Sequence, residues 1–235
     1  MRHSEGLRGV VAVDGLAGTG KSTAARRLAA SLSARYLDTG AMYRAAALGV
    51  LRAGVEPAEP VAVCAVVARS HIEVSTDPDA CLVLLDGADV SQEIRGPAVT
   101  TAVSPVSAVP QVRELLVAQQ RWIISEVITA GGGMVVEGRD IGTVVVPEAP
   151  LKVFLTASTA QRAARRAAQD GVEDVAAVRR AVESRDRFDS TRAASPMRAA
   201  ADAVELDTTA LDVDAVLATL RELVLARGLV AWGRR

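Results

Sequence analysis

Residues 10–22 read VVAVDGLAGTGKS, and this stretch determines the fold class. The compact apolar run at 10–13 predicts a buried strand that ends at Asp14 and Gly15. From Gly15 to Ser22 the chain then matches the pattern G-x-x-x-x-G-K-[ST] at every specified position. Glycines let the backbone wrap around a phosphate, and the N-terminus of the following helix favours negative charge. The stretch therefore predicts a phosphate-binding loop between a strand and a helix of an α/β protein.

The same loop indicates which groups hold a nucleoside triphosphate. We expect the Lys21 side chain to reach the β- and γ-phosphates of ATP and the Ser22 hydroxyl to ligate Mg²⁺. The expected ATP-binding residues of the loop are Gly15, Leu16, Ala17, Gly18, Thr19, Gly20, Lys21, Ser22 and Thr23. The chain contains no asparagine, which excludes the Asn-Lys-x-Asp segment that reads guanine in GTPases. Kinases and motor ATPases both carry this loop, so it does not identify the reaction by itself.

The composition favours a parallel sheet covered by helices. Half of the 235 residues are hydrophobic and only 3% are aromatic, so the core must consist of Val, Leu, Ile and Ala. The formal net charge of −1 argues against a general nucleic-acid-binding protein. The polar N-terminus does not resemble a signal peptide, and no apolar run approaches the roughly 18 residues that span a bilayer. We therefore expect a cytoplasmic protein without nucleic-acid or membrane partners, with Cys64 and Cys81 as buried free thiols.

Strands and helices alternate along most of the chain. Strands are expected at 10–13, 36–37, 134–137, 151–156 and 203–206, and helices at 21–34, 41–52, 110–130, 175–187 and 212–227. Ser158 followed by Gln161 is a capping-box pattern that begins a further helix. This order predicts right-handed βαβ units and a parallel sheet. Residues 71–95 break the alternation and predict a small antiparallel insertion, while the glycines and arginines near the C-terminus predict a frayed tail.

A kinase also needs a second pocket with positive charge for the acceptor phosphate. Arg139 directly follows the strand at 134–137, and ligands of open α/β sheets bind at the carboxyl ends of strands. Arg44, Arg185 and Arg192 are further candidates, because guanidinium groups clamp phosphate oxygens in pairs. For each of these three, a solvated surface charge is an equally good interpretation.

An arginine-rich segment follows the strand at 151–156. It reads TAQRAARRAAQDG over residues 159–171, and the spacing places Arg162, Arg165 and Arg166 on neighbouring faces of a helix. The segment is either a lid that closes over the ATP phosphates or a solvated helix face, and its residues alone leave both interpretations open.

Seven segments together resemble the bacterial cytidylate kinases. They are VDGLAGTGKS (13–22), LDTGAMYR (37–44), LDGADVSQEIR (85–95), SAVPQVRELL (107–116), EGRDIGTVVVP (137–147), RDRFDSTRAASP (185–196) and ADAVELDTTAL (201–211). The resemblance extends over nearly the whole chain, and the antiparallel insertion is typical of the bacterial form of this family.

The resemblance implies a three-layer P-loop kinase whose parallel sheet is flanked by helices. The core would comprise residues 1–63 and 105–235, with a helical lid at about 158–172, and the antiparallel insertion at 64–104 would belong to the monophosphate-binding region. The implied reaction is direct in-line transfer of the γ-phosphoryl group of MgATP to CMP or dCMP by a monomer, without a catalytic base. This reaction serves pyrimidine nucleotide metabolism.

The resemblance also implies a role for each matching residue. On the acceptor side these are Arg44, Arg139 and Arg192 at the CMP phosphate, Ser104, Arg113 and Asp140 at the cytosine edge, Tyr43 beside the base, Arg185 and Asp189 at the sugar, and Thr39 in the same site. On the donor side they are Lys21, Arg162 and Arg166 near the transferred phosphate, and Asp207 and Thr208 near the adenine.

The chain departs from the family pattern at a few positions. Glu137 stands where aspartate often precedes Gly-Arg-Asp, which bears on the surroundings of Mg²⁺, and Phe188 replaces a polar residue in the sugar-binding segment. Two other functions remain open at this point. One is a P-loop kinase for another small acceptor such as UMP, dTMP or shikimate, and the other is an ATP-dependent switch or ATPase module.

Overall fold

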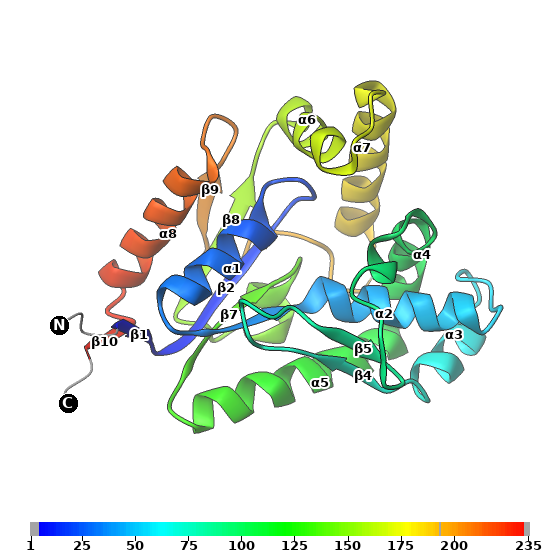
Figure 1. Ribbon diagram of the computed structural model, residues 1–235, viewed down its shortest axis with the longest axis horizontal. Helices are drawn as coiled ribbons and strands as arrows, with labels where there is room; N and C mark the ends of the chain where they lie inside the picture. The colour runs from blue at the N-terminus through cyan, green and yellow to red at the C-terminus, as the bar shows by residue number, and fades with distance from the viewer. Residues whose placement is uncertain (1–4, 193, 233–235) are drawn as a thin grey trace.

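The structure is a computed structural model, and it describes residues 5–192 and 194–232 (Figure 1). The strands are β1 Glu5–Leu7, β2 Gly9–Gly15, β3 Arg35–Asp38, β4 Ile72–Val74, β5 Val83–Leu85, β6 Ala88–Asp89, β7 Gly133–Glu137, β8 Leu151–Thr156, β9 Val204–Asp207 and β10 Val230–Trp232. The helices are α1 Lys21–Ser31, α2 Thr39–Arg52, α3 Pro60–Val67, η1 Glu93–Arg95, α4 Pro97–Ala108, α5 Pro110–Thr129, η2 Ile141–Val145, α6 Thr159–Asp170, α7 Val175–Thr191 and α8 Val213–Ala226.

A five-stranded parallel sheet forms the centre of the molecule, in the order β3-β7-β2-β8-β9. All five strands lie where the sequence predicts them, so the expected three-layer α/β class is confirmed. β2 is flanked on both sides, by β7 and β8. Its residues Val11, Ala12 and Val13 are all 0% exposed, which explains why this strand is apolar without alternation.

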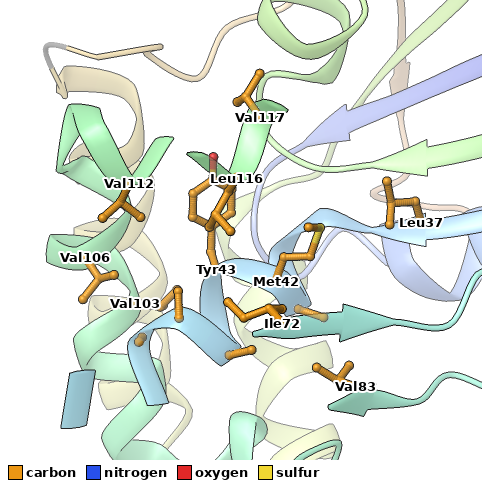
Figure 2. Packing of buried hydrophobic residues seen from close by; sticks show 14 of the residues in the cluster. Leu37, Met42, Tyr43, Ile72, Val83, Val103, Val106, Val112, Leu116 and Val117 are labelled. Atoms are coloured by element: carbon orange, nitrogen blue, oxygen red, sulfur yellow. The ribbon is translucent and has the colours of Figure 1, made fainter. Parts of the chain in front are cut away.

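Helices cover both faces of the sheet, and successive residues of β2 point into two different cores. Val11 and Val13 belong to a core that the sheet shares with α1 and α8. Val10 and Ala12 belong to a larger core formed with α2, α3, α4 and α5. Figure 2 shows part of this larger core, where Met42 of α2 lies close to Ile72 of β4.

The predicted antiparallel insertion is confirmed as a three-stranded sheet in the order β4-β5-β6. Ile72 and Leu85 are buried in the larger core, which fixes this small sheet against α2. The preceding helix α3 was not predicted. Its sequence PVAVCAVV is apolar at nearly every position and so carries no helical period.

Several boundaries differ from those expected. α1 ends at Ser31 rather than near residue 34, because Ser33 adopts a left-handed conformation with φ of 48°. α7 continues to Thr191, beyond the expected end at 187. The prediction of a frayed C-terminal tail is wrong for β10, which pairs antiparallel with β1. Residues 233–235 lie outside the described part of the chain.

The two cysteines are not the buried thiols that the sequence suggested. Cys64 is half-buried, because α3 presents mainly Val63 and Val67 to the core. Cys81 is exposed, because it lies in the turn between β4 and β5. Both thiols are free. Over residues 5–192 and 194–232, no helix has the length and apolar character needed to cross a bilayer.

Candidate active site

A cavity of about 270 Å³ opens at the carboxyl ends of β2, β3 and β7. The phosphate-binding loop forms one side of it, and α2, α4, α5 and α7 contribute side chains to the other. The predicted site residues that line it are Leu16, Ala17, Gly18, Thr19, Gly20, Lys21, Ser22, Thr23, Thr39, Tyr43, Arg44, Arg113, Arg139, Asp140, Arg166, Arg185, Asp189 and Arg192. The fold therefore gathers most of the predicted donor and acceptor residues into one cavity.

The phosphate-binding loop joins β2 to α1, as its motif requires. Gly20 immediately precedes α1 with φ of 85°, a conformation that favours glycine. Lys21 is 8% exposed, and its Nζ lies 3.5 Å from Glu137 Oε2. Burial lowers the pKa of Lys21, the positive charge of Arg139 lowers it further, and Glu137 opposes both. Lys21 is thus a buried cation directed into the cavity.

Glu137 links the phosphate-binding loop to β3. Its carboxylate accepts hydrogen bonds from the Ser22 hydroxyl at 2.9 Å and from the buried Tyr36 hydroxyl. Its backbone carbonyl accepts from Thr39 Oγ1 at 2.7 Å. A hydroxyl and a carboxylate oxygen this close together form an oxygen donor set that suits Mg²⁺. Within the described residues there is no group of three His, Cys, Asp or Glu side chains that could hold a metal alone.

Two aspartates lie near Lys21 and Glu137, of which Asp14 is buried and Asp38 is half-buried. Both oxygens of Asp14 accept backbone hydrogen bonds, from Ile141 and Gly142 at 2.8 Å. Burial raises the pKa of Asp14 to about 6. Asp38 accepts from the Ala41 N–H and so caps α2, and burial followed by the charge of Glu137 raises its pKa to about 6.

The cavity also carries a buried polar pair suited to a nucleotide base. Arg113 and Asp140 form a buried ion pair, and the Arg113 guanidinium lies 5.3 Å from the centre of the Tyr43 ring. Arg192 Nη2 lies 3.8 Å from Asp140 Oδ1. Burial raises the pKa of Asp140 despite these cations. The arrangement offers a hydrogen-bond donor, an acceptor and an aromatic face together.

A cluster of arginines also lines the cavity. Arg44 donates to the Ile94 carbonyl and the Thr100 hydroxyl, both at 3.0 Å. Burial, followed by the neighbouring Arg166, lowers the pKa of Arg44 to about 10, and burial followed by Arg139 lowers that of Arg185 to about 9. Crowding of partly buried guanidinium groups is unfavourable without an anion, so the cluster is suited to a phosphate group.

Helix α6 begins as its capping pattern predicts, since Ser158 Oγ accepts from the Gln161 N–H. Among the described residues of this helix, Arg166 and Gln169 line the cavity. Arg165 donates to the Thr208 hydroxyl at 3.1 Å and to the Thr208 carbonyl at 2.7 Å. The sequence left two interpretations of these arginines open, a lid or a solvated helix face. In the structure Arg166 lines the cavity, and Arg162 and Arg165 donate to Ala17 and Thr208 rather than facing solvent alone.

Five predicted residues are not among those that line the cavity. Gly15 packs against β8, where a Cβ would approach the Leu155 oxygen to 2.3 Å, and Ser104 is half-buried in α4. The others are Arg162, Asp207 and Thr208, of which Thr208 donates to the Thr19 carbonyl at 3.1 Å. The roles assigned to these five stay predictions, as do those of the residues that line the cavity.

The cavity also contains residues that the sequence analysis did not select. They are Asp38, Gly40, Ala41, Ile94, Arg95, Val103, Ser107, Glu137, Gly138 and Gln169, of which only Glu137 had been discussed. Asp38 could have been found, because it precedes a helix directly after a strand end and so occupies an N-cap position. Arg95 and Gln169 carry no such local signal.

Comparison with known proteins identifies what this chain is similar to. A family profile described as cytidylate kinase matches residues 11–225. A cytidylate kinase of Nocardia farcinica is 56% identical over 219 residues, covering 92% of this chain and 93% of the relative. A cytidylate kinase of Corynebacterium glutamicum is 52% identical over 221 residues, covering 92% and 94%.

Among solved structures, an uncharacterized protein from Eubacterium ventriosum ATCC 27560 has a TM-score of 0.50 at 12% identity, covering 93% of this chain and 99% of that chain. At this identity the likeness concerns the fold alone.

Proposed function

The chain belongs to the cytidylate kinase family, and we propose that it transfers the γ-phosphoryl group of ATP to CMP or dCMP. The products are ADP and CDP or dCDP. One observation carries the proposal. The phosphate-binding loop, the arginine cluster and the pair formed by Arg113 and Asp140 all line one cavity. This arrangement matches a reaction between two nucleotides whose phosphates meet.

The reaction is an in-line displacement at the γ-phosphorus of ATP. An oxygen of the CMP phosphate forms a bond to that phosphorus as its bond to the β–γ bridging oxygen breaks, and ADP leaves with the electron pair. The acceptor oxygen is already anionic, so no base is required. Lys21 neutralises charge on the transferred group, and its burial strengthens this interaction. Ser22, beside Glu137, would hold Mg²⁺, which would supply further neutralisation of the phosphate charge.

The acceptor residues orient CMP by charge and hydrogen bonding. The cluster of Arg44, Arg139 and Arg192 binds its phosphate. Asp140 accepts from the amino group of cytosine, while Arg113 donates to the ring acceptors. Uracil presents an oxygen in place of the amino group, so it meets the Asp140 carboxylate unfavourably. Arg185 and Asp189 bind the sugar hydroxyls.

The remaining parts of the chain have proposed roles of their own. Residues 1–63 and 105–235 form the kinase core, and residues 64–104 support the monophosphate site through α2 and η1. Residues 158–172 act as a lid that excludes water and so suppresses ATP hydrolysis. The enzyme works as a monomer in the cytoplasm.

The proposal is tested by measuring ADP release with MgATP and one acceptor at a time. CMP, dCMP, UMP, dTMP, AMP, GMP and shikimate are compared. Strong turnover with CMP and dCMP is expected. A preference for another acceptor would reassign the substrate, and ADP release that is indifferent to every acceptor would identify an ATPase or switch and remove the acceptor-site roles.

A further inference from the structure

Arg162 is held in place beside the phosphate-binding loop. It belongs to α6 and is 4% exposed. Its Nε donates to the Ala157 carbonyl at 3.0 Å, and its Nη1 donates to the Ala17 carbonyl at 3.1 Å. The same Nη1 donates to the carboxylate of Asp186 on α7. One guanidinium group therefore joins the loop, α6 and α7.

Asp186 binds the same stretch of the loop from α7. Its Oδ1 accepts from the Ala17 N–H at 3.4 Å, so both polar groups of the Ala17 backbone are bound by the pair of Arg162 and Asp186. The next residue, Gly18, has φ of +78°, and a Cβ there would lie 2.9 Å from the Arg162 carbonyl oxygen. The pair thus binds the Ala17 backbone, and the α6 backbone leaves no space for a side chain at Gly18.

Adjacent residues of helix α7 serve the cavity and the phosphate-binding loop. Arg185 and Asp189 are one turn apart and line the cavity. Asp186 follows Arg185 directly, which rotates it by about 100° around the helix. Its 14% exposed side chain reaches the donor loop. A single rigid element therefore contacts both sides of the reaction.

We propose that Asp186 is a positioning residue that fixes the donor loop through Arg162 and Ala17 and couples it to the acceptor site through α7. The proposal rests on the proposed kinase function. Asp186 does not touch either substrate; it acts by keeping the Ala17 peptide in the geometry that receives the ATP phosphates. Because α7 also carries Arg185, binding of CMP steadies α7 and strengthens binding of ATP.

The test uses calorimetric titration with a non-hydrolysable ATP analogue and Mg²⁺, without CMP and with saturating CMP. Wild type is compared with Asp186→Asn, Asp186→Glu and a control on the same helix, Glu183→Gln. Glu183 pairs with Arg179 at the surface, 43% exposed. For wild type, CMP should tighten analogue binding about fivefold or more.

Asp186→Asn should weaken analogue binding about tenfold, because a charge-assisted bond to Arg162 is lost, and should remove most of the effect of CMP. Asp186→Glu should recover part of both, and Glu183→Gln should match wild type. The proposal would be overturned if folded Asp186→Asn bound the analogue as tightly as wild type and CMP tightened that binding by the same factor. If Asp186→Asn is unfolded at the assay temperature, Arg162→Met, which removes the donors to Ala17 and Asp186, must show the same loss.

The outcome is separable from that of the proposed function. Analogue binding in the absence of CMP does not depend on which acceptor the enzyme uses. A wild-type protein that binds the analogue but phosphorylates no cytidine nucleotide would disprove the proposed function. The effect of Asp186→Asn on the analogue would still decide whether Asp186 positions the loop.

Discussion

Arg113 of α5 and Asp140, which follows β7, form an ion pair whose side chains are only 5% and 6% exposed. Breaking a buried pair by removing one charge leaves the other uncompensated in a medium of low polarity. The pair lies beside the Tyr43 ring, and both of its residues line the cavity that the phosphate-binding loop also lines. Its charge balance therefore affects both the stability of the protein and the choice of base.

Asp140→Asn should reduce the preference for cytosine. An asparagine amide can rotate to donate to the carbonyl of uracil, so the ratio of kcat/KM for CMP over UMP should fall about tenfold or more. The free energy of unfolding should fall by about 3 kcal/mol, because Arg113 loses its buried partner. Acceptor kinetics and urea unfolding measure the two effects. Glu114→Gln, an exposed change on the helix that carries Arg113, is the control, and an unaltered base preference in Asp140→Asn would refute the role of Asp140.

Lys21→Ala should slow the chemical step far more than it weakens CMP binding. Lys21 contacts the donor side, so kcat should fall by roughly 100-fold or more while the Kd for CMP changes less than about threefold. Stopped-flow or quenched-flow turnover and CMP titration provide the two quantities. Arg52→Ala removes a 44% exposed cation that pairs with Glu93 and serves as the charge control. Equal losses in kcat and CMP affinity would contradict a transition-state role for Lys21.

Asp38→Asn should stabilise the protein at neutral pH. Burial raises the pKa of Asp38 above its unfolded value, so between about pH 4 and pH 6 the folded state binds more protons than the unfolded state. Stability contributed by the protonated carboxyl is therefore present below pH 4 and is lost as the pH rises to 6. Asparagine keeps the cap on the Ala41 N–H without the charge.

The gain for Asp38→Asn should be roughly 1–2 kcal/mol at pH 7 and near zero at pH 4. Urea unfolding at both pH values measures it. Asp202 does not contribute to the change between pH 4 and pH 7. Its hydrogen bond to Lys152 lowers its pKa, so any stability that Asp202 adds is lost only below its unfolded pKa, which lies under this pH range. An equal effect of Asp38→Asn at pH 4 and pH 7 would exclude a titrating Asp38.

Tyr36→Phe should loosen the carboxylate beside Ser22. The Tyr36 hydroxyl donates to Glu137, and burial together with that carboxylate raises the pKa of Tyr36, so the phenol stays protonated. Phenylalanine keeps the ring but leaves one Glu137 oxygen with one hydrogen-bond donor fewer. The free energy of unfolding should therefore fall by about 1–2 kcal/mol. We also expect the Mg²⁺ concentration for half-maximal activity to rise about threefold or more, because Glu137 is no longer oriented. Unfolding and Mg²⁺ dependence both unchanged would show that the hydroxyl does not hold Glu137.

The sequence predicted most reliably the features that depend on a short run of neighbouring residues. The phosphate-binding loop, the strands beside it and the arginines after strand ends follow from local patterns, and the fold brings Arg44, Arg139, Arg185 and Arg192 to one cavity. The loop after β2 and Arg139 after β7 come together because a parallel sheet aligns the ends of its strands at one edge.

Other features depend on contacts that no local pattern records. Asp186 and Ala17 are 169 positions apart, and only the packing of α7 brings them together. The helix α3 was missed because its apolar residues show no period, and β10 was missed because a three-residue strand needs its partner β1 to form. The partial burial of Asp38 and the exposure of Cys81 likewise follow from packing rather than from neighbouring residues.

The chain has only two tyrosines, and the fold gives each of them to a different half of the site. Tyr36 donates a hydrogen bond to the carboxylate beside the phosphate-binding loop, and Tyr43 lies against Arg113, where we propose that the base binds. Replacing both with a fluorinated tyrosine would therefore give a fluorine NMR spectrum of two resonances. One would report on the donor nucleotide and the other on the acceptor, so that the order in which the two bind could be followed without any further label.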